Sequence, residues 1–363
     1  MCLLNAVVTN FTEMMVVRFF LGVAEAGMAP TLIFYLTSFY TRSELAQRIC
    51  AFYSMLAVAG AFSGLLSYGI CQVDNNWQGW RVLFLVEGVL TIVLALISRG
   101  VLPRGINACS FWSDESRMLA RRRILRDSST MIEEEHSLAT FFAPLQEPML
   151  YIFFLVGLCY GTSGAVAGTF LPLVMARMGF DPAQTNLLTV GPNVLGAFCV
   201  YITAKSSDYF RERSLHLLAA MSVTFLGLVI LLVGSSTNLA VNYGACFLIS
   251  AGAFTPSVLF HTWHNCNDAS HDGRAFRTGL LTLATNSGGI VAANIFLSWE
   301  APRYTTAILA SALLEGVGIT LVLSTRLWMM RDNNRRDQLE GITRSTKDIS
   351  SALTAKGTKH ASF

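Results

Sequence analysis

Arg18 and Glu25 are the charged side chains best placed to do chemistry, because both lie inside one long apolar stretch. Their spacing of seven residues is about two helical turns, so both project from one face of a helix. A charge inside hydrocarbon costs about 2.5–3.5 kcal/mol, so it needs a reason. We expect Glu25 to carry a proton and Arg18 to hold a carboxylate through paired hydrogen bonds. Alternatively, each pairs with another helix and fixes the packing.

Three further polar side chains lie in other apolar stretches. Asn193 directly follows a proline, Asn286 begins the run Asn-Ser-Gly-Gly, and Glu315 is central in the last apolar stretch. Amides and carboxyl groups of this kind can face a central cavity and hydrogen-bond a ligand. They can equally bond between helices, so both interpretations stay open.

Asp208 lies near the end of a predicted helix, and Arg211 and Arg213 follow within a few residues. A carboxylate that accepts hydrogen bonds from a helix N-terminus or from arginine can latch one conformation of a moving protein. We therefore predict a conformational latch at Asp208, Arg211 and Arg213. The alternative is a charge cluster that only orients the neighbouring segments in the membrane.

Two other polar pairs are expected to be architectural. Arg81 and Glu87 lie at one end of an apolar stretch and are predicted to pair at the membrane surface. His261 and His264 lie beside Trp263 at a helix end, where histidines are more often interfacial than metal-binding. We predict no catalytic residues and no metal site.

The composition identifies the elements that must position these groups. Of 363 residues, 53% are hydrophobic and 13% are charged, against about 25% charged in soluble domains. The mean hydropathy is +0.50 and the net charge +3. So much apolar surface excludes a disordered chain and a typical soluble enzyme, and the small charge gives no reason to expect nucleic acid. We predict an all-α polytopic membrane protein.

A helix needs about 20 mostly apolar residues to cross the hydrocarbon, and backbone hydrogen bonding favours helices there. Nine stretches qualify: 14–40, 49–72, 82–103, 149–175, 185–204, 215–235, 239–260, 277–298 and 305–327. If the long connection after the third span is cytoplasmic, only Arg81, Arg177 and Arg303 of the 26 Lys and Arg lie outside, and Arg18 lies within a span. This alternation obeys the positive-inside rule and supports the count.

The spans are divided unevenly, three before the long connection and six after it. Because transporters are commonly built from matched halves, we expect three spans of a first half to be absent. The predicted parts are a remnant helix and outer loop at 1–13, an incomplete half at 14–103, a cytoplasmic connection at 104–147, a six-helix half at 148–330 and a disordered cytoplasmic tail at 331–363.

Two local patterns refine this picture. Within the connection, Ser113 to Glu115 can cap a short basic amphipathic helix suited to an anionic inner leaflet, although a solvated linker helix fits equally. Four prolines lie within spans and are expected to kink them: Pro30, Pro172, Pro192 and Pro256.

At this point the residues resemble a known family. The segment from Arg18 to Gly27, with Pro30, resembles the fourth helix of the anion:cation symporter family of the major facilitator superfamily. Gly79-Trp80-Arg81 with Phe84 and Glu87 resembles the start of its sixth helix. Further along, the chain resembles the second-half loop motif at Ser207-Asp208 with Arg211 and Arg213, the eleventh helix at 286–290, the following turn at 301–304 and the cytoplasmic exit at 334–337. Within this family, the chain resembles the fungal allantoate-permease-like members.

The resemblance implies a twelve-helix fold, of which nine transmembrane helices are present, and proton-coupled uptake of small organic anions such as carboxylates, vitamins or ureides. It implies alternating access by a monomer in the plasma membrane, without a cofactor and with the C-terminus in the cytoplasm. Three alternatives stay open: a proton-driven exporter of a metabolite, an inactive truncated transporter, and a membrane enzyme or receptor. The last is disfavoured, because no paired His/Asp cluster lies in the spans and nine spans do not suit a seven-span receptor.

Overall fold

The computed structural model describes residues 2–71, 79–109, 111–127, 138–176, 179, 182–234, 238–267, 271–301 and 303–340. Over these residues all regular elements are helices and none is a strand, so the predicted all-α class is confirmed. The first part of the chain contains α1 (Cys2–Asn5), α2 (Phe11–Glu25), α3 (Met28–Phe39), α4 (Arg42–Cys71), α5 (Gly79–Val101), the short η1 (Ile106–Ala108) and α6 (Asp114–Asp127).

The second part contains longer helices joined by short elements. They are α7 (Leu138–Phe142), η2 (Ala143–Gln146), α8 (Pro148–Ala165), the π-helical η3 (Val166–Phe170), α9 (Leu171–Ala176), α10 (Pro182–Leu188), α11 (Val190–Phe210), α12 (Ser214–Val233), α13 (Leu239–Ala253), α14 (Thr255–Cys266), α15 (His271–Ile295), η4 (Ser298–Glu300) and α16 (Thr305–Glu340).

The nine predicted apolar stretches all fall on these helices. Among the described residues, six helical stretches are long and apolar enough by themselves to cross a membrane: Phe11–Ile33, Gly79–Val101, Pro148–Met175, Ser214–Val233, Leu239–Asn265 and Thr305–Leu339. The other three stretches correspond to α4, to α10 with α11, and to α15. These helices are more polar and pack along their length, α4 against α11 and α15 against α8.

Each proline inside a span coincides with an interruption of its helix. Pro30 lies in the first turn of α3, after the break from α2, and Pro192 and Pro256 lie in the first turns of α11 and α14. Pro172 follows the π-helical η3, where the wider turn accommodates the missing N–H and the ring. The four prolines thus mark changes in the helices, as a kink requires, and the kinks themselves stay a prediction.

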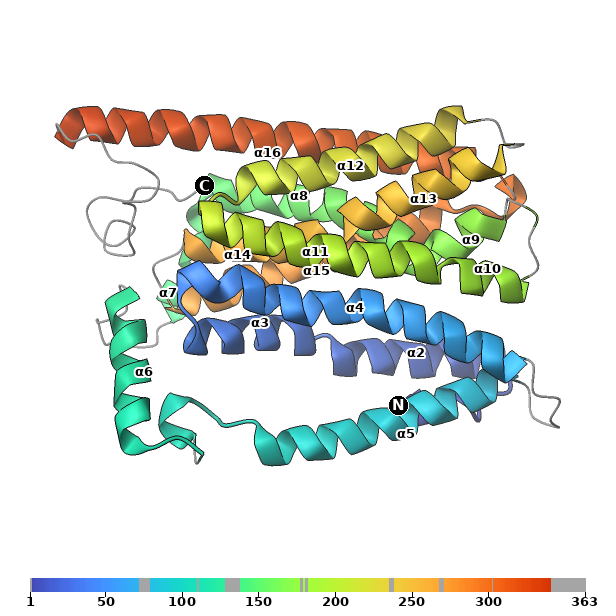
Figure 1. Cartoon of the computed structure of the whole chain (residues 1–363), viewed down its shortest axis with the longest axis horizontal. Coiled ribbons are helices and arrows are strands. Elements are labelled where there is room, and N and C mark those ends of the chain that lie inside the picture. Colours follow the sequence, from blue (N-terminus) through green and yellow to red (C-terminus); the bar gives the residue numbers. More distant parts are fainter. Residues whose placement is uncertain are drawn as a thin grey trace.

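Figure 1 shows most helices running along one bundle axis, with α4 of the first part lying beside α11 of the second. Helix α6 differs, because it lies across one end of the bundle instead of along it. We call this end the α6 end. The break between α2 and α3 falls near the middle of the bundle, which places Glu25 far from either end.

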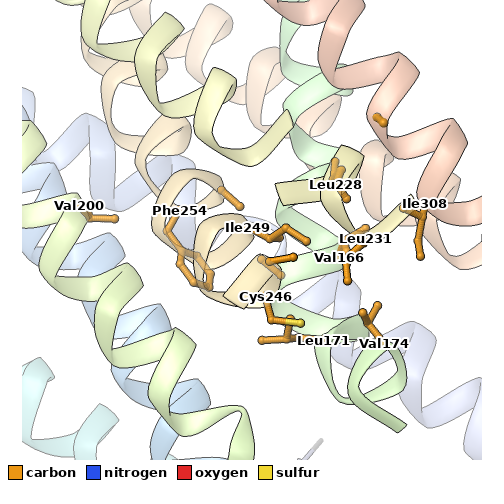
Figure 2. Packing of buried hydrophobic residues seen from close by; sticks show 14 of the residues in the cluster. Val166, Leu171, Val174, Val200, Leu228, Leu231, Cys246, Ile249, Phe254 and Ile308 are labelled. Atoms are coloured by element: carbon orange, nitrogen blue, oxygen red, sulfur yellow. The ribbon is translucent and has the colours of Figure 1, made fainter. Parts of the chain in front are cut away.

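Two apolar clusters form the core. The larger one joins the two parts, because Ile33, Ile49 and Cys50 of the first part pack with residues of α9, α11 and α13. Figure 2 shows its centre, where Cys246 and Ile249 of α13 lie near Leu228, Leu231 and Val166. The second cluster surrounds Trp263 and includes Phe153, Phe260, Met221 and Met329.

Helix α16 extends further than the sequence predicted. The tail was expected to be disordered from residue 331, but α16 continues to Glu340. An ion pair one turn apart, between Arg336 and Asp332 at 2.7 Å, supports this extension. The remainder of the predicted tail, 341–363, and residues 128–137 of the connection lie outside the described residues.

Candidate functional site

Arg18 and Glu25 lie on α2, whose start is fixed by a reciprocal cap. The Asn10 side chain accepts a hydrogen bond from the Glu13 N–H at 2.9 Å, and the Glu13 carboxylate accepts one from the Thr9 N–H at 2.9 Å. From this start, Arg18 and Glu25 both have exposed side chains, and Glu25 is the last residue of the helix. The helix thus presents both charges outside the packed core.

The surroundings of Arg18 and Glu25 come from α1 and α5. The Arg18 guanidinium carbon lies 4.9 Å from the centre of the Phe84 ring, a cation–π contact. Cys2 of α1 lies close enough to Arg18, Glu25 and Glu87 for all three charges to act on its thiol. Three charged groups from α2 and α5 therefore gather around the end of α1.

The predicted pair between Arg81 and Glu87 does not form. The Arg81 guanidinium instead donates to the Val8 carbonyl at 3.1 Å and lies 5.1 Å from the centre of the Trp80 ring. Arg81 thereby ties α5 to the segment between α1 and α2. Glu87 is left half-buried near Cys2, without an ion pair to a described residue.

Asn193 lies where the two parts of the chain meet. It is 6% exposed, and a Cβ on Gly60 of α4 would lie 3.1 Å from its Nδ2. Its Oδ1 has no hydrogen-bond partner among the described residues. A buried amide oxygen without a partner is costly, so this atom can accept a hydrogen bond from a ligand or from water.

Asn286 is separate from Asn193 and has an exposed side chain on α15. Its neighbour Thr285 shares a hydrogen bond of 3.0 Å with the Tyr160 hydroxyl, so α15 is fixed against α8 by the adjacent face. Asn294, further along α15, donates to the carbonyl of Ile290 within its own helix. The structure therefore does not gather these amides into one cluster.

Glu315 is enclosed in the second part of the chain. It is 1% exposed, and its Oε2 accepts a hydrogen bond of 2.7 Å from the Ser163 hydroxyl of α8. Its Oε1 has no partner among the described residues, and the carboxyl group lies within electrostatic reach of the Cys159 thiol. Ser163 lies three residues before the π-helical η3, so Glu315 supports α8 where that helix changes its winding.

The latch residues lie at the α6 end and connect the two parts. The Asp208 carboxylate is 2.5 Å from the Arg213 guanidinium, and its other oxygen accepts a hydrogen bond of 2.8 Å from the Gln47 backbone N–H of α4. Arg213 also donates to the Ser207 hydroxyl at 3.0 Å. Burial raises the pKa of Asp208 above its ordinary value, and the charge of Arg213 opposes this shift.

Arg211 takes another position. It ends α11 in the left-handed backbone region, with φ 54°, and its side chain is exposed. A non-glycine residue in this conformation is strained, which indicates that the turn after Asp208 is held by its surroundings. The neighbouring Glu212 forms an ion pair with Arg326 of α16 and so extends the polar network across the α6 end.

Sequence reasoning placed His261 and His264 at an interface, but both are buried at 1% exposure. His261 Nδ1 and His264 Nε2 are 3.1 Å apart. Tyr53 of α4 stacks on His261 with ring centres 6.2 Å apart, so this pair contacts the other part of the chain. Spacing alone could not reveal this contact, and the same holds for the partners Ser163 and Gln47.

The sequence matches a known protein family and several transporters. A family model described as Major Facilitator Superfamily matches residues 1–293. The chain is 41% identical to the MFS-type transporter efuF of Hormonema carpetanum over 351 residues, which is 96% of this chain and 71% of that protein. It is 36% identical to the major facilitator-type transporter hxnP of Emericella nidulans, over 96% of this chain and 71% of the relative.

One further relative and one solved structure match with lower sequence identity. The high-affinity nicotinic acid transporter of Saccharomyces cerevisiae is 24% identical over 92% of this chain and 62% of that protein. Among solved structures, an outward-facing bacterial homologue of the iron transporter ferroportin matches with 12% identity and a TM-score of 0.47, over 89% of this chain and 93% of that one.

Proposed function

The chain belongs to the Major Facilitator Superfamily and is a multi-pass membrane transporter of the secondary type, and we propose that it moves small organic anions together with protons. We assign it to the anion:cation symporters, with nine of the family's twelve transmembrane helices in this sequence. The single observation that carries the proposal is the pair Arg18 and Glu25, which share one exposed face of α2.

The placement of Arg18 and Glu25 supports these roles. An exposed charge cannot face hydrocarbon without a large cost, so this face of α2 is best explained as the wall of a water-filled cavity. Arg18 offers a planar fork for a carboxylate, although it now lies over the Phe84 ring. Protonation of Glu25 removes an unpaired charge and allows the loaded carrier to change conformation. The nicotinic acid transporter among the relatives acts on a small carboxylate, which agrees with this substrate class.

The other candidate residues take supporting roles in the proposal. Asn193 lies between the two parts with a free Oδ1 and is placed to bond a substrate or its water. Asn286 is exposed on α15, and we propose that it bonds the substrate separately from Asn193. Glu315 is enclosed and paired with Ser163, so we assign it to the support of α8 rather than to proton exchange.

The orientation follows from the charges. Figure 1 shows α6 and the C-terminal ends of α5, α11 and α16 at the α6 end, and these segments or the residues after them carry Arg104, Arg121, Arg211 and Arg331. We therefore place this end in the cytoplasm of a plasma-membrane protein. The contact of Asp208 with Arg213 and with the Gln47 N–H then closes the cytoplasmic side. Opening that side breaks the contact, which is how a latch controls alternating access.

An uptake experiment tests the proposal. Proteoliposomes containing the chain are given an inward pH gradient, and the entry of radiolabelled nicotinate and of other small carboxylates is measured. We expect acid outside to increase entry, Glu25→Gln to abolish this dependence, and Glu87→Gln to preserve it as a neighbouring control. If the reversed gradient instead drives export, the chain is a proton-driven exporter and not a symporter. The absence of any gradient-dependent flux for the whole panel would contradict the proposal.

A further inference from the structure

A second candidate site lies at the corner between the end of α5 and α6. A cavity of about 410 Å³ lies there, and its lining consists of Arg104, Gly105, Ile106, Asn107, Ala108 and Arg121. This volume is in the range of small-ligand sites, about 300–1,000 Å³. Two guanidinium groups and one amide are the polar side chains of the lining, so the cavity suits an anion.

The two arginines of this cavity form no ion pair with any residue that the structure describes. Arg104 and Arg121 have no acidic partner among the described residues, and both are exposed. Two other arginines of α6 differ, because Arg117 bonds Asp114 and the Cys109 carbonyl, and Arg123 pairs with Glu44 of α4. The pair of Arg123 with Glu44 connects α6 to the bundle without involving Arg104 or Arg121.

The surface beside the cavity is apolar. Leu102, Phe111, Met118 and Leu119 are each more than half exposed. Figure 1 shows α6 lying across the end of the bundle, past the point where α5 ends, which is the level of the membrane surface in the proposed orientation. A basic helix with exposed apolar side chains at this level is the arrangement that lies on an anionic membrane surface.

We propose that the cavity between η1 and α6 binds the phosphate-bearing headgroup of an anionic lipid of the inner leaflet. Arg104 and Arg121 hold the phosphate oxygens, Asn107 donates a hydrogen bond, and the acyl chains lie against the exposed apolar side chains. The two arginines favour an anion, and the exposed apolar side chains favour a lipid over a soluble anion, because only a lipid also covers Phe111, Met118 and Leu119. The inference rests on the proposed orientation, which places this corner at the cytoplasmic surface.

Binding to the full chain, purified in an uncharged detergent, tests the proposal without any need for transport. The probe is a fluorescent short-chain phosphatidylinositol 4-phosphate, and phosphatidylcholine serves as the uncharged comparison. We expect the double variant Arg104→Gln with Arg121→Gln to bind roughly 30-fold more weakly, since each surface arginine contributes about a fivefold factor. Arg331→Gln with Arg335→Gln removes the same charge elsewhere at the α6 end and should change binding by less than about twofold.

A second variant keeps both arginines. Ala108→Asp places a negative charge in the lining and should also abolish binding, while its melting temperature reports that the chain is folded. Equal binding by wild type and the arginine double variant would overturn the proposal. Equally tight binding of soluble inositol 1,4-bisphosphate would overturn the assignment to a lipid. The binding assay does not depend on uptake. A negative result therefore contradicts the lipid site alone, and the uptake experiment tests the proposed function separately.

Discussion

The two parts of the chain bury their side chains to very different extents. Helix α2 has no buried residue, and Phe11, Phe19 and Leu96 of α2 and α5 are 67–79% exposed. In the second part, Trp263 and Tyr160 are at most 1% exposed. Exposed apolar residues are no defect in a membrane, because lipid covers them, whereas exposed charges there need water or a partner.

This difference separates two kinds of intramembrane polar group. Glu315, in the packed part, is enclosed and accepts a hydrogen bond from a fixed neighbour, as an architectural group does. Arg18 and Glu25, in the open part, have exposed side chains on one helix face. Hydropathy and charge alone therefore do not distinguish a transport residue from an architectural one. The burial of the side chain does.

The largest effect should come from close packing in the second part. A Cβ on Gly161 of α8 would overlap the backbone of Thr285, so Gly161→Ala must push α8 and α15 apart. We expect a loss of about 3 kcal/mol in the free energy of unfolding, seen as a lower melting temperature in detergent. The same change at Gly22 of α2 meets nothing within 4 Å and should be neutral or stabilising by up to about 1 kcal/mol. Equal losses of stability at Gly161 and Gly22 would contradict the difference in packing between the two parts.

The contact between the parts should give the next effect. Arg213→Ala leaves the buried Asp208 carboxylate with the Gln47 N–H alone, and we expect a cost of about 2 kcal/mol in the melting experiment. Arg211→Ala, at an exposed side chain two residues away, should change stability by less than about 0.5 kcal/mol. A larger loss for Arg211 than for Arg213 would show that the latch is assigned to the wrong arginine.

A more conservative change tests the role of Arg18 on the exposed face of α2. Arg18→Lys keeps the charge but loses the planar fork that binds a carboxylate through two bonds. We expect KM for a transported carboxylate to rise by about tenfold, which is about 1.4 kcal/mol, while the melting temperature stays unchanged. An unchanged KM would indicate that Arg18 acts only through its charge or through its contact with Phe84.

The smallest effect concerns pH. Burial raises the pKa of Asp208 from its ordinary 3.8, so the latched structure binds a proton more tightly than a form with a solvated carboxylate. The latched form is therefore favoured as pH falls towards the raised pKa, and it loses this advantage as pH rises through that value. Relative to Asp208→Asn, the wild type should melt at increasingly lower temperature on going from about pH 4 to pH 7. The opposite slope would show that Arg213, not burial, dominates.

Much of the fold could be predicted because its determinants are local. The apolar stretches and the four prolines each act within one helix, and the structure places helices and breaks accordingly. The π-helix at 166–170 could not be predicted from the sequence. A proline indicates that the regular α-helix is interrupted, but not which kind of turn replaces it.

The site was predicted less completely, because partners distant in sequence decide it. Ser163 lies 152 residues from Glu315, and Gln47 lies 161 residues from Asp208. The latch could be proposed from the charges of Asp208 and Arg213, but its contact with α4 involves a backbone N–H that carries no sequence signal. The contact of His261 with Tyr53 of α4 likewise joins residues far apart in the sequence.

The most direct test of the central claim compares one substitution in the two environments. Glu25→Gln and Glu315→Gln both replace a carboxyl group by an amide, and proton movement with carboxylate entry is recorded for each in proteoliposomes. We expect Glu25→Gln to uncouple entry from the pH gradient, and Glu315→Gln to retain coupling, because the amide oxygen can still accept from Ser163. Coupling lost in Glu315→Gln and kept in Glu25→Gln would contradict the account and move the proton site into the packed part.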